Sequence, residues 1–241
     1  MIIDIFLPII LISLLIGFGL LLVKLIKSKI NIFIKLLLVF LGFFIIGIIF
    51  FTMIIIRSWI ADPAEMEKAV SLAEEYILET NRKNVELNGG YYDDGGVYPF
   101  EYAANAKNTQ DHTEFFIYFD VDSKKIVDNY VSKRWEKELR GNIEGYVKQK
   151  LGKINQFYLW FDDTVGSDYD VDPNQQSSYK DFEATASIDI YIPRKKKDED
   201  IKIFNEILSH LKDEAKLKHV KLTISYFDVS PLEDEIWEGS Y

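Results

Sequence analysis

Cysteine is absent from the 241-residue chain, and histidine is scarce. Without cysteine the chain has no disulfide bonds, thiol nucleophiles or thiolate metal sites. The three histidines, His112, His210 and His219, show no metal-type spacing. The sequence also contains no nucleophile elbow, zinc-protease helix or glycine-rich phosphate loop. These absences favour a non-catalytic protein. A carboxylate-based hydrolase stays an alternative, because paired acids can hydrolyse glycosides.

Charge is almost missing from the first 60 residues and strongly negative after them. Residues 1–60 hold one acidic and five basic residues, whereas residues 61–241 hold 37 acidic and 23 basic residues, a net charge of −14. Such a surface repels nucleic-acid phosphates and anionic lipid headgroups, and it attracts cations and basic proteins. The composition therefore predicts no nucleic-acid binding and a protein partner with a basic surface.

Two long apolar runs fill the nearly uncharged beginning of the chain, at about residues 5–23 and 36–56. Each approaches the roughly 20 residues that a helix needs to cross a bilayer core. The first run could instead be a cleaved signal peptide. However, no positive charge precedes it, and it is longer than the usual apolar region of about 7–15 residues. Residues 1–60 are therefore expected to form a membrane anchor of two transmembrane helices.

Four lysines lie between the two apolar runs and set the expected orientation: Lys24, Lys27, Lys29 and Lys35. Loops rich in lysine and arginine stay on the cytoplasmic side of a membrane. With two spans, the chain after residue 60 then lies on the opposite side. The sequence predicts a multi-pass protein of the cell membrane with an extracytoplasmic C-terminal domain.

Residues 61–111 are expected to contain one helix followed by a connecting region. Asp62 and Pro63 are typical of a helix start, and apolar residues at helical spacing continue to about Thr80. The following stretch, 81–111, is rich in glycine and asparagine, which indicates loops with at most short strands.

Residues 112–230 are predicted to form an α+β domain, followed by an acidic tail over 231–241. Alternating and helical apolar patterns predict strands near 115–121, 157–161, 184–192 and 220–226, and helices over 123–151 and 198–217. The order βαββαβ is that of a ferredoxin-like fold, a four-stranded antiparallel sheet with two helices on one face. This fold hosts many functions, so it does not choose among them.

Five aromatic residues would share the face of that sheet opposite the two helices: Phe116, Tyr118, Tyr158, Trp160 and Tyr191. Two interpretations are open. The helix over 63–80 could fold back and cover these rings, or the face could be exposed for a partner. Tyrosine and tryptophan beside carboxylates make a suitable binding surface for a basic ligand. The five residues are therefore the predicted partner-binding site.

A long acidic loop, residues 162–182, joins two of the predicted strands. Asp168, Asp170 and Asp172 are spaced like the opening of an EF-hand, but Pro173 replaces its glycine and Tyr179 its bidentate glutamate. The stretch fits a solvated loop, or a weak calcium site formed by these three aspartates. No other cofactor is expected.

The sequence as a whole favours a membrane-anchored, extracytoplasmic binding or interaction protein, immunity-like or an envelope-assembly factor. The alternatives are a structural subunit of a membrane complex, a weakly calcium-dependent domain, or the carboxylate-based hydrolase.

Overall fold

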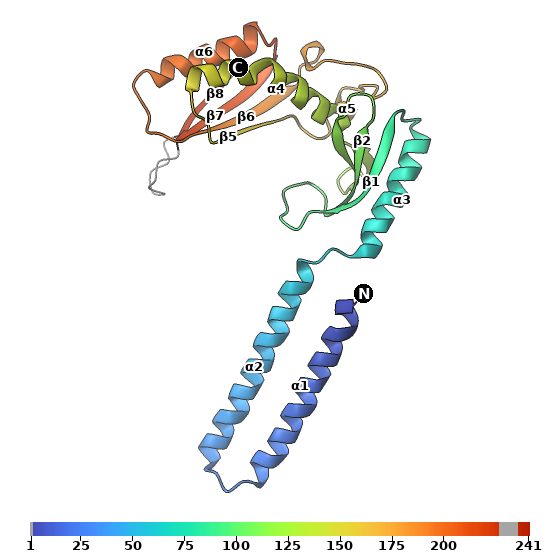
Figure 1. Cartoon of the computed structure of the whole chain (residues 1–241), viewed down its shortest axis with the longest axis vertical. Coiled ribbons are helices and arrows are strands. Elements are labelled where there is room, and N and C mark those ends of the chain that lie inside the picture. Colours follow the sequence, from blue (N-terminus) through green and yellow to red (C-terminus); the bar gives the residue numbers. More distant parts are fainter. Residues whose placement is uncertain (1, 227–235) are drawn as a thin grey trace. The chain divides into compact units, whose positions relative to one another are not determined.

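A computed structural model describes residues 2–226 and 236–241 of the chain. These residues form two compact units, Met1–Asp62 and Pro63–Tyr241. The fold is of the mixed α+β class, and the described residues form helices and two four-stranded sheets (Figure 1). Residues 231–235 of the predicted acidic tail lie outside the described residues.

The first unit consists of two apolar helices, α1 (Ile2–Lys27) and α2 (Ile32–Ser58), which lie side by side (Figure 1). The rings of Phe18 and Phe43 meet edge to face at 5.1 Å. The ammonium group of Lys35 donates hydrogen bonds to the carbonyls of Ile26 and Ser28, which closes the turn between the helices. Among the described residues, one stretch, Ile32–Ile55, is long and apolar enough to cross a membrane.

The second unit begins with α3 (Pro63–Glu79), which packs on the first sheet. This sheet, sheet A, is an antiparallel meander of β1 (Val85–Tyr92), β2 (Tyr102–Asn108), β3 (Glu114–Asp120) and β4 (Lys125–Asp128). The stretch expected to be mostly loop, 81–111, thus contains two full strands. Figure 1 shows α3 alongside β1 and β2.

The second sheet, sheet B, has the order β5-β6-β7-β8. Its strands are β5 (Gln156–Trp160), β6 (Thr185–Ile192), β7 (His219–Tyr226) and β8 (Ile236–Ser240). β6 and β7 are parallel and are joined through α6 (Asp200–Asp213), whereas β5 and β8 pair antiparallel at the edges. The loop from β5 to β6 contains a short helix, α5 (Val165–Asp168), and a 3₁₀ turn, Tyr179–Asp181.

The expected ferredoxin-like sheet is wrong, because β3 does not pair with the later strands. It pairs with β2 and β4 in sheet A, and β8 takes the fourth place in sheet B. The helix expected over 123–151 starts later than expected, as α4 (Tyr130–Leu151), because β4 uses residues 125–128. Local alternation marks Phe115 and Ile117 as the buried side of a strand, but it does not specify the neighbouring strand.

One hydrophobic core joins both sheets, and α4 runs through it. Tyr130 at the start of α4 contacts Phe115 of sheet A at 5.2 Å between ring centroids. Farther along α4, Trp135 and Leu139 are fully buried in the same core as Ile188 and Leu222 of sheet B. Burying a side chain of this size contributes roughly 1.5–3 kcal/mol. The core therefore makes Pro63–Tyr241 a single folding unit.

Two aspartates with buried carboxylates, one at the end of β4 and one at the start of α6, each form an ionic network with neighbouring side chains. Asp128 at the end of β4 accepts hydrogen bonds from Tyr76 at 2.7 Å and from Arg82 at 3.2 Å, which ties α3 to sheet A. Asp200 at the start of α6 accepts two hydrogen bonds of 2.7 Å from Arg194 and one of 2.7 Å from Tyr226. Because Asp200 is fully buried, these partners offset the cost of burying its charge.

Candidate functional site

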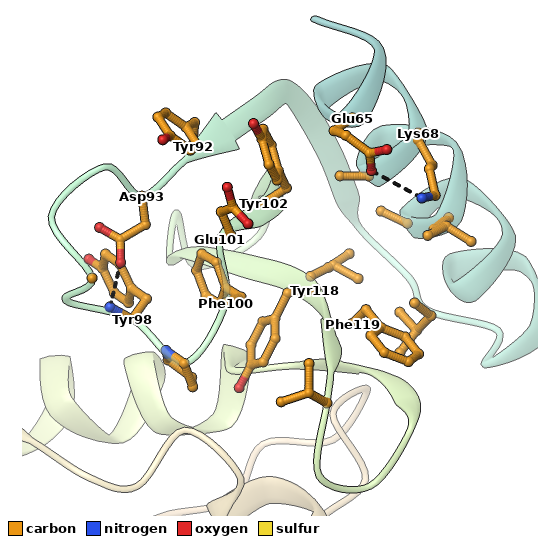
Figure 2. Close-up of a pocket in the computed structure, with 18 of the residues that line it drawn as sticks. Glu65, Lys68, Tyr92, Asp93, Tyr98, Phe100, Glu101, Tyr102, Tyr118 and Phe119 are labelled. Atoms are coloured by element: carbon orange, nitrogen blue, oxygen red, sulfur yellow. Dashed lines mark hydrogen bonds and ion pairs between the residues drawn. The ribbon is translucent and has the colours of Figure 1, made fainter. Parts of the chain in front are cut away.

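A cavity of about 1040 Å³ lies within the second unit, between α3 and one end of sheet A (Figure 2). Three segments line it: the first half of α3, the connection from β1 to β2, and the end of β3 with the following turn into β4. On α3 the lining side chains include Ala69, Leu72 and Ala73, two of them short. Short side chains on the helix leave space in front of the larger residues on the strands, and that space is the cavity.

Aromatic rings form most of the opposite wall. Tyr92 and Tyr102 stack at 5.0 Å between ring centroids, and Tyr98 and Phe100 stack at 5.1 Å. Phe100 also contacts Tyr118 at 4.5 Å. Phe100 and Tyr118 are buried, so these rings are held by their neighbours and are not free to reorient. The cavity therefore has a preformed aromatic wall.

Asp93 shapes the connection from β1 to β2. Its carboxylate accepts a hydrogen bond from the backbone N–H of Tyr98 at 2.7 Å, and its own N–H donates to the carbonyl of Glu101 at 2.9 Å. Gly96, which lies between Asp93 and Tyr98 in the chain, adopts a φ of 63°, a left-handed conformation that glycine takes without strain. These contacts turn the chain back and carry Tyr98 and Phe100 to the cavity (Figure 2).

The charged residues around the cavity are mostly acidic. Lys68 pairs with Glu65 at 3.0 Å. In contrast, Asp94 and Glu101 are exposed and, within the described ranges 2–226 and 236–241, form no ion pair with a basic side chain. The pKa of the Tyr92 hydroxyl is raised by partial desolvation, by Tyr102, and by the nearby charges of Glu101, Asp94 and Asp93. The cavity mouth is thus a region of negative potential.

The five aromatic residues predicted as one binding face are divided between the two sheets. Phe116 and Tyr118 belong to β3 in sheet A, where Tyr118 lines the cavity and Phe116 packs against Phe100. Tyr158, Trp160 and Tyr191 belong to β5 and β6 in sheet B. The expectation that all five share a face is wrong, because it depended on β3 pairing with the later strands.

Sheet B exposes the aromatic residues that the alternation placed away from its helices. Tyr158 is 49% exposed and Trp160 is 41% exposed, and Tyr191 meets Tyr158 edge to face at 6.1 Å. Asp189 lies opposite Tyr158 in the strand pairing. The helix expected to cover these rings, α3, packs on sheet A instead. In the part of the chain that the structure describes, this face of sheet B is open.

Two of the three aspartates proposed as calcium ligands accept hydrogen bonds that stabilise turns in their own loop. Asp168 accepts a hydrogen bond from the hydroxyl of Thr164 at 2.8 Å, and Asp172 accepts bonds from the backbone of Asn174 and the side chain of Gln175. Asp170 adopts a φ of 50°. No group of three or more acidic or histidine side chains converges as a metal site among residues 2–226 and 236–241. Of the two interpretations of this stretch, the solvated loop stays the favoured one, and a weak calcium site stays the alternative.

The sequence did contain a signal for the cavity in the run YYDDGGVYPFEY, residues 91–102. An acidic DDGG turn between aromatic residues indicates a hairpin that brings rings from both of its arms together. The glycine and asparagine content of the surrounding stretch led to its interpretation as a connecting region.

Comparison with known proteins identifies no family. No protein-family model and no curated protein match the chain. A solved structure described as a DUF5037 family protein from Ruminococcus gnavus is similar with 13% sequence identity and a TM-score of 0.33. The match covers 66% of this chain and 75% of that chain. A likeness this distant carries no functional argument.

Proposed function

We propose that the chain is a membrane-anchored binding protein whose second unit, Pro63–Tyr241, holds a ligand in the aromatic cavity. The observation that carries this proposal is the cavity itself, about 1040 Å³ within one compact unit and walled by stacked rings. Small-molecule sites in proteins are typically concave, largely apolar and about 300–1,000 Å³ in volume, with a few polar groups at defined positions. The cavity is slightly larger than the upper limit of that range.

Both helices of the first unit are proposed to cross the membrane. α1 and α2 are apolar along most of their length, and their contact through Phe18 and Phe43 is consistent with a hairpin of two spans. The lysines at the turn between them place that turn in the cytoplasm by the positive-inside rule. Pro63–Tyr241 then lies outside the cytoplasm, where the cavity would meet extracytoplasmic ligands.

Binding is proposed in preference to catalysis because two of the carboxylates at the cavity, those of Asp93 and Glu65, already serve the fold. Asp93 holds the backbone of Tyr98, and Glu65 is paired with Lys68. The exposed carboxylates of Asp94 and Glu101 can attract a ligand, and most of the remaining wall is aromatic or aliphatic, which recognises shape. A structural subunit of a membrane complex would not require a preformed cavity of this kind.

A second, protein-binding role is supported by the open face of sheet B. Tyr158 and Trp160 are exposed there beside Asp189, and large exposed rings near carboxylates favour a partner with basic groups. An immunity-like protein or an envelope-assembly factor would use such a surface to hold a basic protein.

The cavity proposal is tested by ligand-observed NMR on the full chain in detergent, with a panel of small water-soluble compounds. Phe119→Ala removes a ring at the cavity, and Tyr158→Ala is the matched control, since the two rings are 46% and 49% exposed. We expect bound compounds to lose affinity several-fold with Phe119→Ala and not with Tyr158→Ala. Equal effects of the two substitutions, or no bound compound, would contradict the proposal.

A further inference from the structure

We infer that the aromatic cavity selects small organic cations, in which a substituted ammonium group is joined to apolar carbon. This inference rests on the proposed ligand-binding function of the cavity and adds the chemical class of the ligand. It depends on two features of the same wall: ring faces that attract cations, and carboxylates at the mouth that no basic side chain neutralises.

The rings supply the first feature. The face of an aromatic ring is negative, and a cation within about 6 Å of its centroid is attracted. Tyr92, Tyr98 and Tyr102 line the cavity and are only partly buried, so parts of these rings are accessible from it. Figure 2 shows Tyr92 and Tyr102 on one side of Glu101, and Tyr98 and Phe100 on its other side. An ammonium group here would meet more than one ring.

The carboxylates supply the second feature. Among the described residues, two basic ones line the cavity, Lys68 and Lys124, and Lys68 is paired with Glu65. The charge of Lys124 is then outnumbered by the three carboxylates of Asp93, Asp94 and Glu101. Asp93 is buried and accepts the Tyr98 N–H, whereas Asp94 and Glu101 are exposed at the mouth. An entering cation gains their attraction, and an entering anion is repelled. The net charge of −14 on residues 61–241 acts in the same direction over a longer range.

Three probes of nearly equal shape test the inference: phenethylammonium, phenethyl alcohol and hydrocinnamate, which are cationic, neutral and anionic. Their affinities for the detergent-solubilised full chain are measured by calorimetry at low and high salt, with detergent alone as the blank. We expect phenethylammonium to bind roughly tenfold more tightly than the alcohol at low salt, and hydrocinnamate to bind most weakly. The advantage of the cation should shrink as salt is added.

Two double substitutions test which carboxylates produce the preference for the cation. Asp94→Asn with Glu101→Gln removes the two carboxylates at the mouth that form no ion pair among the described residues, and Asp213→Asn with Glu214→Gln removes two exposed acids at the C-terminal end of α6. The first pair should lower the affinity for phenethylammonium about tenfold and leave that for phenethyl alcohol unchanged. The second pair changes the total charge equally and should change neither affinity by more than about twofold.

The outcomes separate the two proposals. If phenethyl alcohol binds as tightly as phenethylammonium and Phe119→Ala weakens both, the cavity is a ligand site and the inference of cation selectivity is overturned. If none of the three probes binds, the inference of cation selectivity is overturned, and the compound panel with Phe119→Ala decides the proposed function separately. If both charge pairs weaken phenethylammonium equally, the preference comes from overall charge, and the cavity mouth does not provide it.

Discussion

Gly90 of β1 lies directly against Met66 of α3. A Cβ atom added to Gly90 would be 2.8 Å from the Cβ of Met66 and 2.9 Å from its carbonyl oxygen. Contacts this short do not occur between real atoms of these types. Any residue larger than glycine at position 90 would therefore displace α3 from its present position on sheet A. The position of α3 in turn sets the width of the cavity, because Ala69 and Leu72 form its helical wall.

Gly90→Ala should push α3 away from sheet A and disturb the cavity. We expect the free energy of unfolding to fall by about 1–3 kcal/mol, as for overpacking elsewhere, and the affinity for cavity ligands to fall several-fold. Gly141→Ala is the control, because Gly141 lies within α4 with nothing near its added Cβ. That substitution should raise stability by roughly 0.5–1 kcal/mol. Denaturant titrations of the full chain measure the stabilities of both variants. Unchanged stability with Gly90→Ala would contradict the close contact of α3 with Gly90.

The loss of stability as the pH falls from 4 to 2 should depend on Asp200. Burial alone would raise the pKa of this carboxyl, but Arg194, Tyr226 and the N–H of Lys197 lower it to about 2. Because the pKa in the folded protein lies below that of the unfolded chain, the stabilisation is present above about pH 4. It is lost as the pH falls toward 2.

Asp200→Asn should therefore lower the free energy of unfolding near pH 7 by about 3 kcal/mol, because it leaves the guanidinium of Arg194 without its charged partner. The difference from the wild type should narrow as the pH falls from 4 to 2. Asp198→Asn, in the same turn and exposed, should have little effect. Denaturant titrations across this pH range make the comparison. A difference that stays constant with pH would contradict the assigned role of Asp200.

Trp160→Ala should weaken binding of a basic partner to sheet B. The substitution removes an exposed ring from the open face and leaves the buried side of β5 intact. In a pull-down from envelope extract, we expect less of the partner with Trp160→Ala, and less for the wild type as salt is added. Circular dichroism first confirms that the variant is folded. Equal recovery by wild type and variant would remove this face as an interaction site.

Calcium should not bind to the acidic loop. Asp168, Asp170 and Asp172 do not converge as a metal site in the part of the chain that the structure describes, and hydrogen bonds hold the side chains of Asp168 and Asp172 to neighbouring loop residues. Calorimetry with calcium up to millimolar concentration should give no heat beyond dilution. Heat that disappears when Asp168, Asp170 and Asp172 are all changed to asparagine would establish a weak site and refute this prediction.

Local pattern predicted single elements well and their pairing poorly. The helix expected over 63–80 is α3, Pro63–Glu79, and the strand expected over 184–192 is β6, Thr185–Ile192. Their periodicity is uninterrupted, so burial of one face specifies them. β1 escaped prediction because its pairing with β2 shifts between Leu87 and Gly90, where Gly89 has a φ of 95°. Such an irregularity breaks the alternation that marks a strand.

Prediction of the candidate site succeeded where it needed only the exposed side of one strand, and it failed where it needed the pairing of strands. Alternation alone indicated that Tyr158 and Trp160 face away from the helices, and both are exposed. The same alternation placed Tyr118 with them, but Tyr118 is buried against Phe100, which lies 18 residues earlier in the chain, in the connection from β1 to β2. Contacts of this kind are set by tertiary packing, and no local pattern of the sequence encodes them.

The central claim is that the aromatic cavity is a site for organic cations displayed outside the membrane, and cysteine labelling in intact cells tests it most directly. The chain has no cysteine, so Val121→Cys, at an exposed residue of the cavity lining, introduces a single reactive group. Two controls are Ser28→Cys, in the turn between α1 and α2, and Ser209→Cys, exposed on α6 and away from the cavity.

The measurement is the rate of reaction with a membrane-impermeant methanethiosulfonate, with and without phenethylammonium. We predict that Val121→Cys and Ser209→Cys react in intact cells, that Ser28→Cys reacts only after permeabilisation, and that phenethylammonium slows the reaction of Val121→Cys alone. Reaction of Val121→Cys only after permeabilisation, or at a rate that phenethylammonium does not change, would contradict the claim.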